Sequence, residues 1–205
     1  TPMQMAVGYS VFANGGYRIA PYFIKRIEDE KGNVLEQFQP ITPLNGAKRV
    51  IDPRNAFIMT HMMQDVVNYG TAAKAKQLGR TDLAGKTGTT SNFVDAWFCG
   101  FQKDLVTVAW TGYDEPKSLG NNETGGRIAL PIWMDYMGPV LKGVPMAEYK
   151  PPTGILATKI NSATGFRESA GDINEYFFSE HLPPVSDNVV DPTPKVTKDL
   201  KDQLF

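Results

Sequence analysis

The sequence predicts an α+β fold in which an antiparallel sheet is flanked by helices. Two segments carry helix-start signals followed by apolar residues at helical spacing. Between the second of them and a third predicted helix, three short apolar runs are joined by connections too short for a crossover, so the predicted strands are adjacent and antiparallel. The chain has 205 residues, 41% of them hydrophobic and 21% charged, which is enough for a domain with a buried core.

The first helix is predicted from Thr1 to Gly15. Thr1 is suited to cap the helix, Pro2 fits its first turn, and Gln4 completes a capping box. Gly15 and Gly16 then end the helix. A helix that opens at the first residue has no preceding chain to pack on, so we expect this chain to be part of a longer protein.

A hairpin is predicted next, with strands at residues 22–28 and 33–38 around a turn at 29–32. A second helix opens at Asp52-Pro53 and ends near Gly70. Its predicted buried face consists of Ala56, Met59, Met63 and Val66. One or two further helical turns are expected over residues 71–77.

The three strands of the predicted sheet cover residues 83–89, 96–101 and 105–111. Large apolar side chains occur at both alternating sets of positions, which is typical of a sheet covered on both faces. These residues are Trp97, Phe98, Val106, Val108 and Trp110. A loop rich in Gly and Asn (117–127) leads to a helix at 129–141, where Gly138-Pro139 is expected to kink or end it.

Prolines accumulate from residue 143 onward. We therefore divide the chain into a domain at residues 1–142 and a Pro-rich extension at 143–205, which ends in a flexible tail from Pro183. Within the extension, a small strand is expected at 155–160, followed by a turn at 161–165.

Composition excludes several classes of function. Lys and Arg total 21 against 22 Asp and Glu, and this balance argues against a nucleic-acid partner. One cysteine and two widely separated histidines offer neither a disulfide framework nor a metal-ligand pattern, so we expect no metal and no cofactor. Cys99 itself is predicted to be a buried small hydrophobe. No apolar run approaches the ~18 residues of a membrane span.

The segment that carries chemistry is Gly85-Lys86-Thr87-Gly88-Thr89-Thr90. On an edge strand it would offer free backbone groups to an extended peptide, and Gly88 would allow close approach. Lys86 supplies a cation, and the hydroxyls of Thr87 and Thr89 can hold a carboxylate. The N–H of Thr89 can donate to a developing oxyanion. This combination suits acyl transfer on a peptide that ends in a free carboxylate.

K-T-G, together with S-x-x-K and S-D-N, is the signature of penicillin-interacting serine enzymes. With its flanking segments, the chain resembles the C-terminal part of the transpeptidase domain of class A (bifunctional, type one-A) penicillin-binding proteins. The resemblance covers residues 1–142 and implies a penicillin-binding/serine β-lactamase-like fold, of which only the C-terminal portion is present. The matching segments are residues 1–6, 12–16, 86–90, 95–98, 110–114 and 124–126, with Ala129 and residues 131–133.

The resemblance implies a mechanism and partners. A serine forms an acyl-enzyme with a peptidoglycan stem peptide, an amine of a neighbouring stem resolves it, and β-lactams trap the same serine. Lys86 would orient the proton-shuttling groups, and the Thr89 N–H would complete the oxyanion hole. Residues 87–90, namely Thr87, Gly88, Thr89 and Thr90, would bind the substrate or the β-lactam. The implied location is the periplasmic side of the bacterial cytoplasmic membrane, with the anchor and a glycosyltransferase domain outside this chain.

The nucleophile is not found in this chain. No serine is followed three residues later by lysine, so S-x-x-K is absent and no serine has a local activating base. Ser186-Asp187-Asn188 spells S-D-N but follows K-T-G in a Pro-rich segment, where we interpret it as a solvated turn. An upstream segment or a companion chain is therefore expected to carry S-x-x-K and S-x-N, and this chain alone is predicted to be inactive.

The sequence leaves three alternative functions open. Gly85-Lys86-Thr87 matches the end of a nucleotide-binding P-loop, but Arg80 stands where that motif requires glycine. A non-catalytic fragment that binds peptidoglycan or a partner would keep the sheet without the chemistry. A β-lactamase or D,D-carboxypeptidase would share the chemistry, but the segments at 95–98 and 124–126 favour the class A transpeptidase. Asp95 is predicted to serve a structural hydrogen bond at a strand start.

Overall fold

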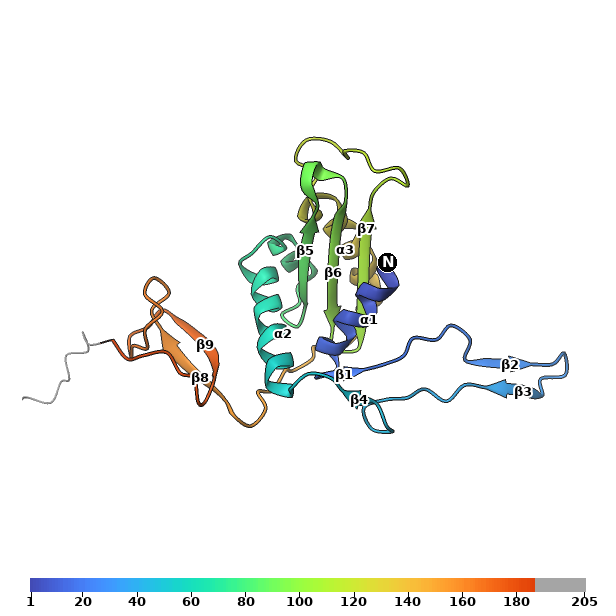
Figure 1. The fold of residues 1–205 in the computed structure, drawn as a ribbon, viewed down its shortest axis with the longest axis horizontal. Coiled ribbons are helices and arrows are strands. Elements are labelled where there is room, and N and C mark those ends of the chain that lie inside the picture. The colour runs from blue at the N-terminus through green and yellow to red at the C-terminus, as the bar shows by residue number, and fades with distance from the viewer. Residues whose placement is uncertain (187–205) are drawn as a thin grey trace, which may run out of the picture. The chain divides into compact units, whose positions relative to one another are not determined.

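The computed structural model describes residues 1–186, which divide into two compact units, Thr1–Thr153 and a second beginning at Gly154. The centre of the first unit is the predicted sheet, with strands in the order β5-β6-β7 and both pairs antiparallel (Figure 1). The bounds are β5 Ala84–Thr89, β6 Ala96–Gln102 and β7 Leu105–Thr111. The predicted α+β class and all three strands are confirmed.

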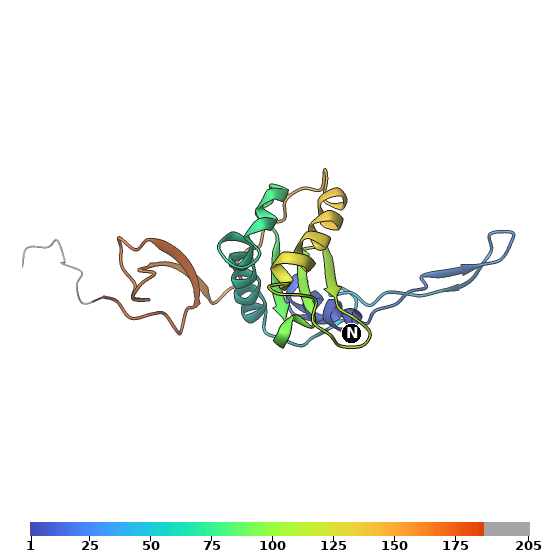
Figure 2. The same ribbon diagram turned by 90° about the horizontal axis from the view of Figure 1, so that it is seen from above.

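Helices cover both faces of this sheet. Helix α1 (Pro2–Ala13) lies against one face and α3 (Leu130–Val140) against the other, while α2 (Pro53–Asn68) runs beside β5 (Figure 2). The coverage expected from the strand pattern is therefore confirmed, although Trp110 on β7 remains 40% exposed. Because α2 stands at the side of β5, the backbone of that strand has no neighbouring strand there within the described residues.

The predicted helix caps form as expected. Thr1 Oγ1 accepts a hydrogen bond from the N–H of Gln4 (3.3 Å), and both halves of the capping box are present. Asp52 caps α2 by accepting from the N–H of Arg54 (2.8 Å). These side chains satisfy backbone donors that have no partner inside the helix.

The predicted buried face of α2 was wrong at one of its four positions, Met59. The helix buries Ala56, Phe57, Thr60, Met63 and Val67. Met59 is 38% exposed, whereas Val66 is partly buried and packs against the main core. The four predicted residues keep helical spacing, but the face of α2 that packs against the sheet also includes Thr60 and Val67. Hydrophobicity alone favoured Met59, because a buried threonine gives no apolar signal.

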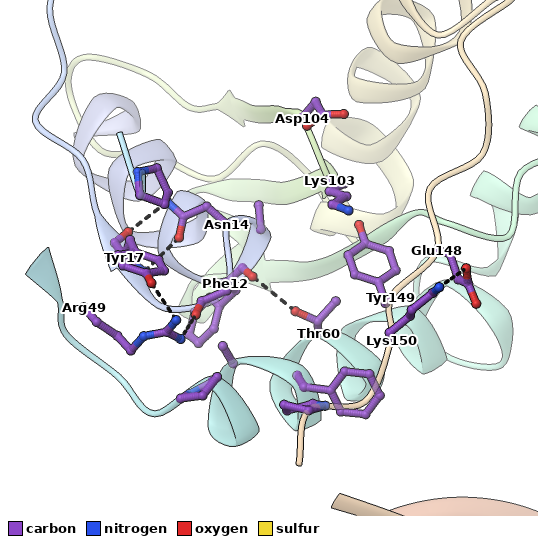
Figure 3. Close-up of a pocket in the computed structure, with 17 residues that line it drawn as sticks. Phe12, Asn14, Tyr17, Arg49, Thr60, Lys103, Asp104, Glu148, Tyr149 and Lys150 are labelled. Carbon is purple, nitrogen blue, oxygen red and sulfur yellow. Dashed lines mark hydrogen bonds and ion pairs between the residues drawn. The ribbon is translucent and has the colours of Figure 1, made fainter. Parts of the chain in front are cut away.

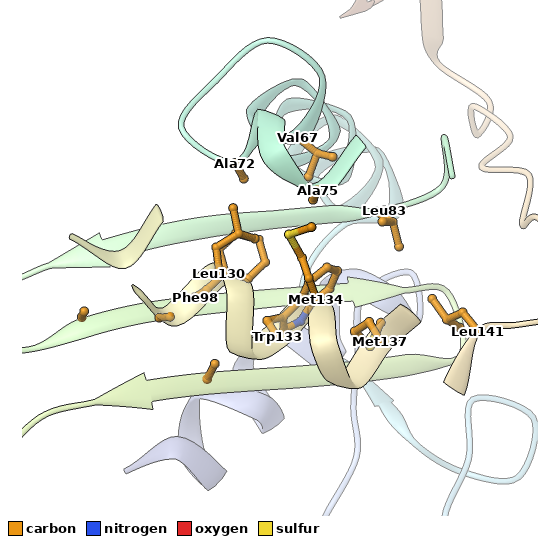
Figure 4. Packing of buried hydrophobic residues seen from close by; sticks show 13 residues of the cluster. Val67, Ala72, Ala75, Leu83, Phe98, Leu130, Trp133, Met134, Met137 and Leu141 are labelled. Carbon is orange, nitrogen blue, oxygen red and sulfur yellow. The ribbon is translucent and has the colours of Figure 1, made fainter. Parts of the chain in front are cut away.

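The main core lies between the sheet, α3 and the end of α2 (Figure 4). Phe98 and Trp133 are fully buried and meet edge to face, with ring centroids 5.0 Å apart. The Trp133 indole donates to the carbonyl oxygen of Thr107 (3.1 Å), so its one polar group is satisfied. Burying each such side chain contributes about 1.5–3 kcal/mol. The labelled residues of this cluster are Val67, Ala72, Ala75, Leu83, Phe98, Leu130, Trp133, Met134, Met137 and Leu141.

The hairpin is confirmed with shorter strands, β2 (Arg26–Glu28) and β3 (Val34–Gln37). Its turn is closed by the Asp29 carboxylate, which accepts from the N–H groups of Lys31 and Asn33 (both 2.8 Å). A two-residue pairing of β1 (Tyr17–Arg18) with β4 (Lys48–Arg49) was not predicted, because such short segments carry no periodicity.

Between α2 and α3, several short helical segments also form. The turns expected after α2 form a 3-10 helix, η1 (Ala73–Leu78). A second one, η2 (Ser91–Phe93), lies between β5 and β6. A π-helical turn, η3 (Gly125–Ala129), leads into α3, and Pro139 lies in the last turn of α3 rather than breaking it earlier.

A buried ion pair ties residues 143–153 to the sheet. The carboxylate of Asp82 accepts from Arg80 (2.8 and 2.6 Å), from the Gln102 amide (3.1 Å) and from the N–H of Ala147 (2.8 Å). The Arg80 guanidinium also donates to the carbonyl oxygen of Val144 (2.8 Å). Burial favours the neutral carboxyl, but these donors outweigh it and hold the pKa of Asp82 below its usual value. The first unit therefore extends through residues 143–153.

The second unit contains β8 (Ile155–Ile160) and β9 (Ile173–Phe178), which pair antiparallel. The strand and turn expected at 155–165 are confirmed, and the N–H of Gly165 donates to Asn161 O (2.8 Å). Strand β9 was not predicted. In the S-D-N sequence, Ser186 is buried and its N–H donates to Arg167 O (3.1 Å). Asp187, Asn188 and the rest of the predicted tail lie outside the described residues.

No helix within residues 1–186 combines the length and the apolar composition needed to cross a bilayer.

Cys99 provides a direct test of this packing. The thiol is buried on β6, as predicted, and burial raises its pKa to about 11. Because the thiolate is the reactive species, we expect the folded protein to leave Cys99 unlabelled by iodoacetamide at pH 8, with full labelling after denaturation. Peptide mass mapping measures both states. Rapid labelling of Cys99 in the folded protein would contradict the burial described here.

Candidate active-site strand

Strand β5 presents part of the K-T-G-T segment along an open edge. The N–H of Thr90 donates to Asp95 O (3.0 Å), which marks Thr90 as bonded to the β6 side. Ladder bonds alternate along an antiparallel edge strand, so Gly88 and Lys86 also face β6. The backbone N–H and C=O groups of Thr87 and Thr89 therefore point to the open side. The predicted oxyanion donor, the Thr89 N–H, is among them.

The charge of Lys86 lies at the same edge. Its ammonium donates to the carbonyl oxygen of Thr87 at 2.9 Å and lies 3.4 Å from the Thr87 hydroxyl. Because the Thr87 carbonyl points to the open side, the ammonium is placed where a ligand paired to β5 would lie. A cation next to two hydroxyls and an N–H donor is an arrangement that attracts a carboxylate.

Gly125 allows the start of η3 to pack closely against β5 next to Thr89. The N–H of Gly125 donates to Thr89 Oγ1 (3.0 Å). A Cβ on Gly125 would lie 2.3 Å from Trp97 O and 2.5 Å from Gly88 O, so no larger residue fits there without moving the strand. The hydroxyl of Thr89 accepts this bond from Gly125, so its own proton is available to donate to a ligand.

The turn after β5 is held by side chains. The N–H of Asp95 donates to Thr90 Oγ1 (2.7 Å), and the Trp110 indole donates to Asp95 Oδ1 (2.9 Å). The predicted structural role of Asp95 is confirmed. Of the four predicted binding residues, Thr87, Gly88 and Thr89 lie along the strand, whereas the hydroxyl of Thr90 takes part in this turn.

Known proteins that resemble this chain show which family it belongs to. Residues 1–137 match the family described as the penicillin binding protein transpeptidase domain. The chain belongs to this family. A relative from Neisseria lactamica, named penicillin-binding protein 1A, is 47% identical over 182 residues, which are 89% of this chain. Another with the same name from Pseudomonas aeruginosa is 40% identical and aligns with 94% of this chain.

Solved structures agree with this assignment. The crystal structure of penicillin-binding protein 1A from Haemophilus influenzae matches 91% of this chain with a TM-score of 0.83 and 31% identity. A penicillin-binding protein from Mycobacterium tuberculosis matches 74% of it with a TM-score of 0.61 and 27% identity. The chain spans 21% of the Neisseria relative, 29% of the Pseudomonas relative and 33% of the Haemophilus chain. The predicted penicillin-binding transpeptidase fold is therefore confirmed.

The nucleotide-binding alternative is wrong for this penicillin-binding transpeptidase chain. Gly85-Lys86-Thr87 lies inside strand β5, whereas a P-loop requires a loop that opens a helix.

One contact at the site was missed by sequence reasoning. The hydroxyls of Thr71 and Thr87 lie 2.7 Å apart. Thr71 stands just beyond α2 and Thr87 stands on β5, and no sequence motif links two threonines at that separation. Only the packing of α2 beside β5 brings them together.

A hollow in the first unit is lined by residues from α1, α2 and the segment 148–152 (Figure 3). It has a volume of about 740 Å³ and contains none of the predicted site residues. Arg49 within it donates to Tyr17 Oη and to Gly15 O (both 2.7 Å). Lys150 pairs with Glu148 at 3.4 Å. The Arg49 contacts join the end of α1 to β1 and β4, whereas the Lys150–Glu148 pair is exposed.

Proposed function

We propose that this chain forms the K-T-G-T wall of a serine D,D-transpeptidase site within a longer, bifunctional penicillin-binding protein. One observation carries the proposal: the Lys86 ammonium, the hydroxyls of Thr87 and Thr89 and the N–H of Thr89 lie together on the open edge of β5. The family assignment supports this reading over a non-catalytic binding fragment.

In this proposal, a peptidoglycan stem peptide lies along β5 as an added strand. The hydroxyls of Thr87 and Thr89, with the charge of Lys86, hold its terminal carboxylate. A serine from outside this chain attacks the penultimate D-alanine carbonyl, and the oxygen that gains negative charge accepts from the Thr89 N–H. The peptide bond breaks, terminal D-alanine leaves with a proton, and an amine of a neighbouring stem then displaces the serine to form the cross-link.

β-Lactams would follow the first half of this path. Their carboxylate occupies the place of the peptide carboxylate, and opening of the lactam ring leaves the serine acylated. The site requires that serine and its lysine base from outside this chain, because S-x-x-K is absent from these 205 residues. We place the assembled enzyme on the periplasmic side of the cytoplasmic membrane, where stem peptides are cross-linked.

The proposal is tested by exposing the full-length protein to benzylpenicillin and measuring its intact mass. We expect one adduct, and peptide mapping is expected to place it on a serine outside the 205 residues analysed. An adduct on a serine within them, or no adduct on the folded protein, would contradict the proposal.

The Thr89 hydroxyl has its own test. Thr89→Val removes the outward proton and keeps the shape, so capture of benzylpenicillin is expected to slow about tenfold or more. The uncharged methyl ester of the same β-lactam is expected to lose much less. The measurement is the acylation rate for each ligand, with Thr153→Val as the matched control at an exposed threonine outside the site. Equal losses for both ligands would argue against carboxylate binding by Thr89.

A further inference from the structure

The backbone on both sides of Thr71 is fixed. A Cβ on Gly70 would lie 2.9 Å from the Cα of Val66, so only glycine lets the chain pass this close to α2. Ala72 is fully buried, and its N–H donates to Val66 O (3.1 Å). Thr71 itself is exposed. The fold thus holds one polar side chain in a defined place between two anchored neighbours.

The hydroxyl of Thr71 reaches the candidate carboxylate site. Its oxygen lies 2.7 Å from Thr87 Oγ1, a distance at which one of the two hydroxyls donates to the other. The Lys86 ammonium, which only donates, lies 3.4 Å from the same Thr87 oxygen. Within residues 1–186, Thr87 Oγ1 is the one acceptor in hydrogen-bond range of the Thr71 hydroxyl.

A second glycine keeps these groups together. A Cβ on Gly126 would lie 2.7 Å from Thr71 O and 3.6 Å from Thr87 Cγ2. The backbone at the start of η3 therefore lies directly against Thr71, next to the bond from Gly125 to Thr89. Thr71, Thr87 and Thr89 therefore lie next to the backbone at the start of η3.

We propose that Thr71 is a positioning residue for carboxylate recognition. Its hydroxyl donates to Thr87 Oγ1, so that oxygen accepts from Thr71 and the Thr87 proton points to the ligand. Thr87 has a single proton, and without Thr71 its oxygen keeps only the longer contact from the Lys86 ammonium, at 3.4 Å, among the described residues. In the same way, Thr89 Oγ1 accepts from the N–H of Gly125, which leaves the Thr89 proton for the ligand. This inference rests on the proposed function, because it concerns the carboxylate of that substrate.

The test compares two ligands on the full-length protein. Thr71→Val is expected to slow acylation by benzylpenicillin about tenfold relative to wild type, since a hydrogen bond to a charged group is weakened. Acylation by the methyl ester of the same β-lactam is expected to change less than about twofold. Thr71→Ser restores the hydroxyl and should recover the benzylpenicillin rate. Thr71→Ala removes the hydroxyl with a smaller side chain and should reproduce the valine result.

The outcomes separate this inference from the proposed function. Equal losses for the two ligands in both Thr71→Val and Thr71→Ala would overturn the positioning role, and so would a wild-type rate or a failure of serine to rescue. The proposed function would stand in those cases if wild type is acylated and Lys86→Ala is not. A wild-type protein that captures neither ligand would overturn both.

Discussion

Acylation by benzylpenicillin is expected to slow about a thousandfold when Lys86 is replaced by alanine in the full-length protein. Among residues 1–186, the Lys86 ammonium bonds only within its own strand, at 2.9 Å from Thr87 O, and its side chain is exposed. Replacing Lys86 removes the positive charge from the open edge of β5 and leaves the buried core unchanged. The acylation rate, followed by intact mass, is therefore expected to fall while the thermal midpoint stays within about 2 °C of wild type.

Two further variants make the Lys86 result specific. Lys74→Ala removes an exposed lysine on η1 and serves as the matched control, for which the wild-type rate is expected. Lys86→Arg keeps the charge but changes its geometry, and an intermediate rate is expected. A folded Lys86→Ala protein that is acylated as fast as wild type would remove Lys86 from the mechanism.

The largest effect on stability is expected at the buried ion pair. Asp82→Ala leaves the Arg80 guanidinium, only 9% exposed, without its carboxylate. Breaking a buried pair by removing one partner costs about 3–5 kcal/mol. The N–H of Ala147 and the Gln102 amide lose their acceptor as well. Urea unfolding of the domain, with Asp114→Ala as an exposed control, measures the change. A loss below about 1 kcal/mol would show that solvent or another group replaces the carboxylate.

The same carboxylate makes stability depend on acid. The pKa of Asp82 is lowered in the folded protein, so its contribution is fully present above the ordinary value of 3.8. It is lost as the pH falls below 3.8 toward the folded-state pKa. Wild type is therefore expected to lose more stability than Asp82→Ala between pH 5 and pH 3. Parallel losses in the two proteins would assign the acid sensitivity to other groups.

Much of the fold was predictable because its signals are local. Capping residues at Thr1 and Asp52 marked two helices, and three apolar runs with short connections defined the sheet and its order. The K-T-G-T segment predicted acyl transfer, because a cation, two hydroxyls and backbone groups are adjacent in one strand. Features that depend on residues close together in the chain can be predicted from a single sequence.

The remainder depends on packing between distant segments. Asp82 meets Ala147 across 65 residues, and Thr71 meets Thr87 only because α2 lies beside β5. The buried face of α2 was shifted for the same reason, since the sheet determines which side of an amphipathic helix is covered. The pairing of β1 with β4 joins two-residue strands, which are too short to show alternation.

The open edge of β5 has a consequence for inhibitor resistance. The groups that Thr87 and Thr89 present there include main-chain N–H and C=O, which side-chain substitution leaves in place. An inhibitor built as an extended strand would bind these main-chain groups. Substitution by proline removes the N–H, but it also disturbs the strand, and no substitution removes the C=O. Gly125 restricts the alternatives further, because any side chain there would collide with Gly88 and Trp97. Under the proposed function, an inhibitor directed at this backbone would meet few substitutions that weaken its binding and keep the strand intact.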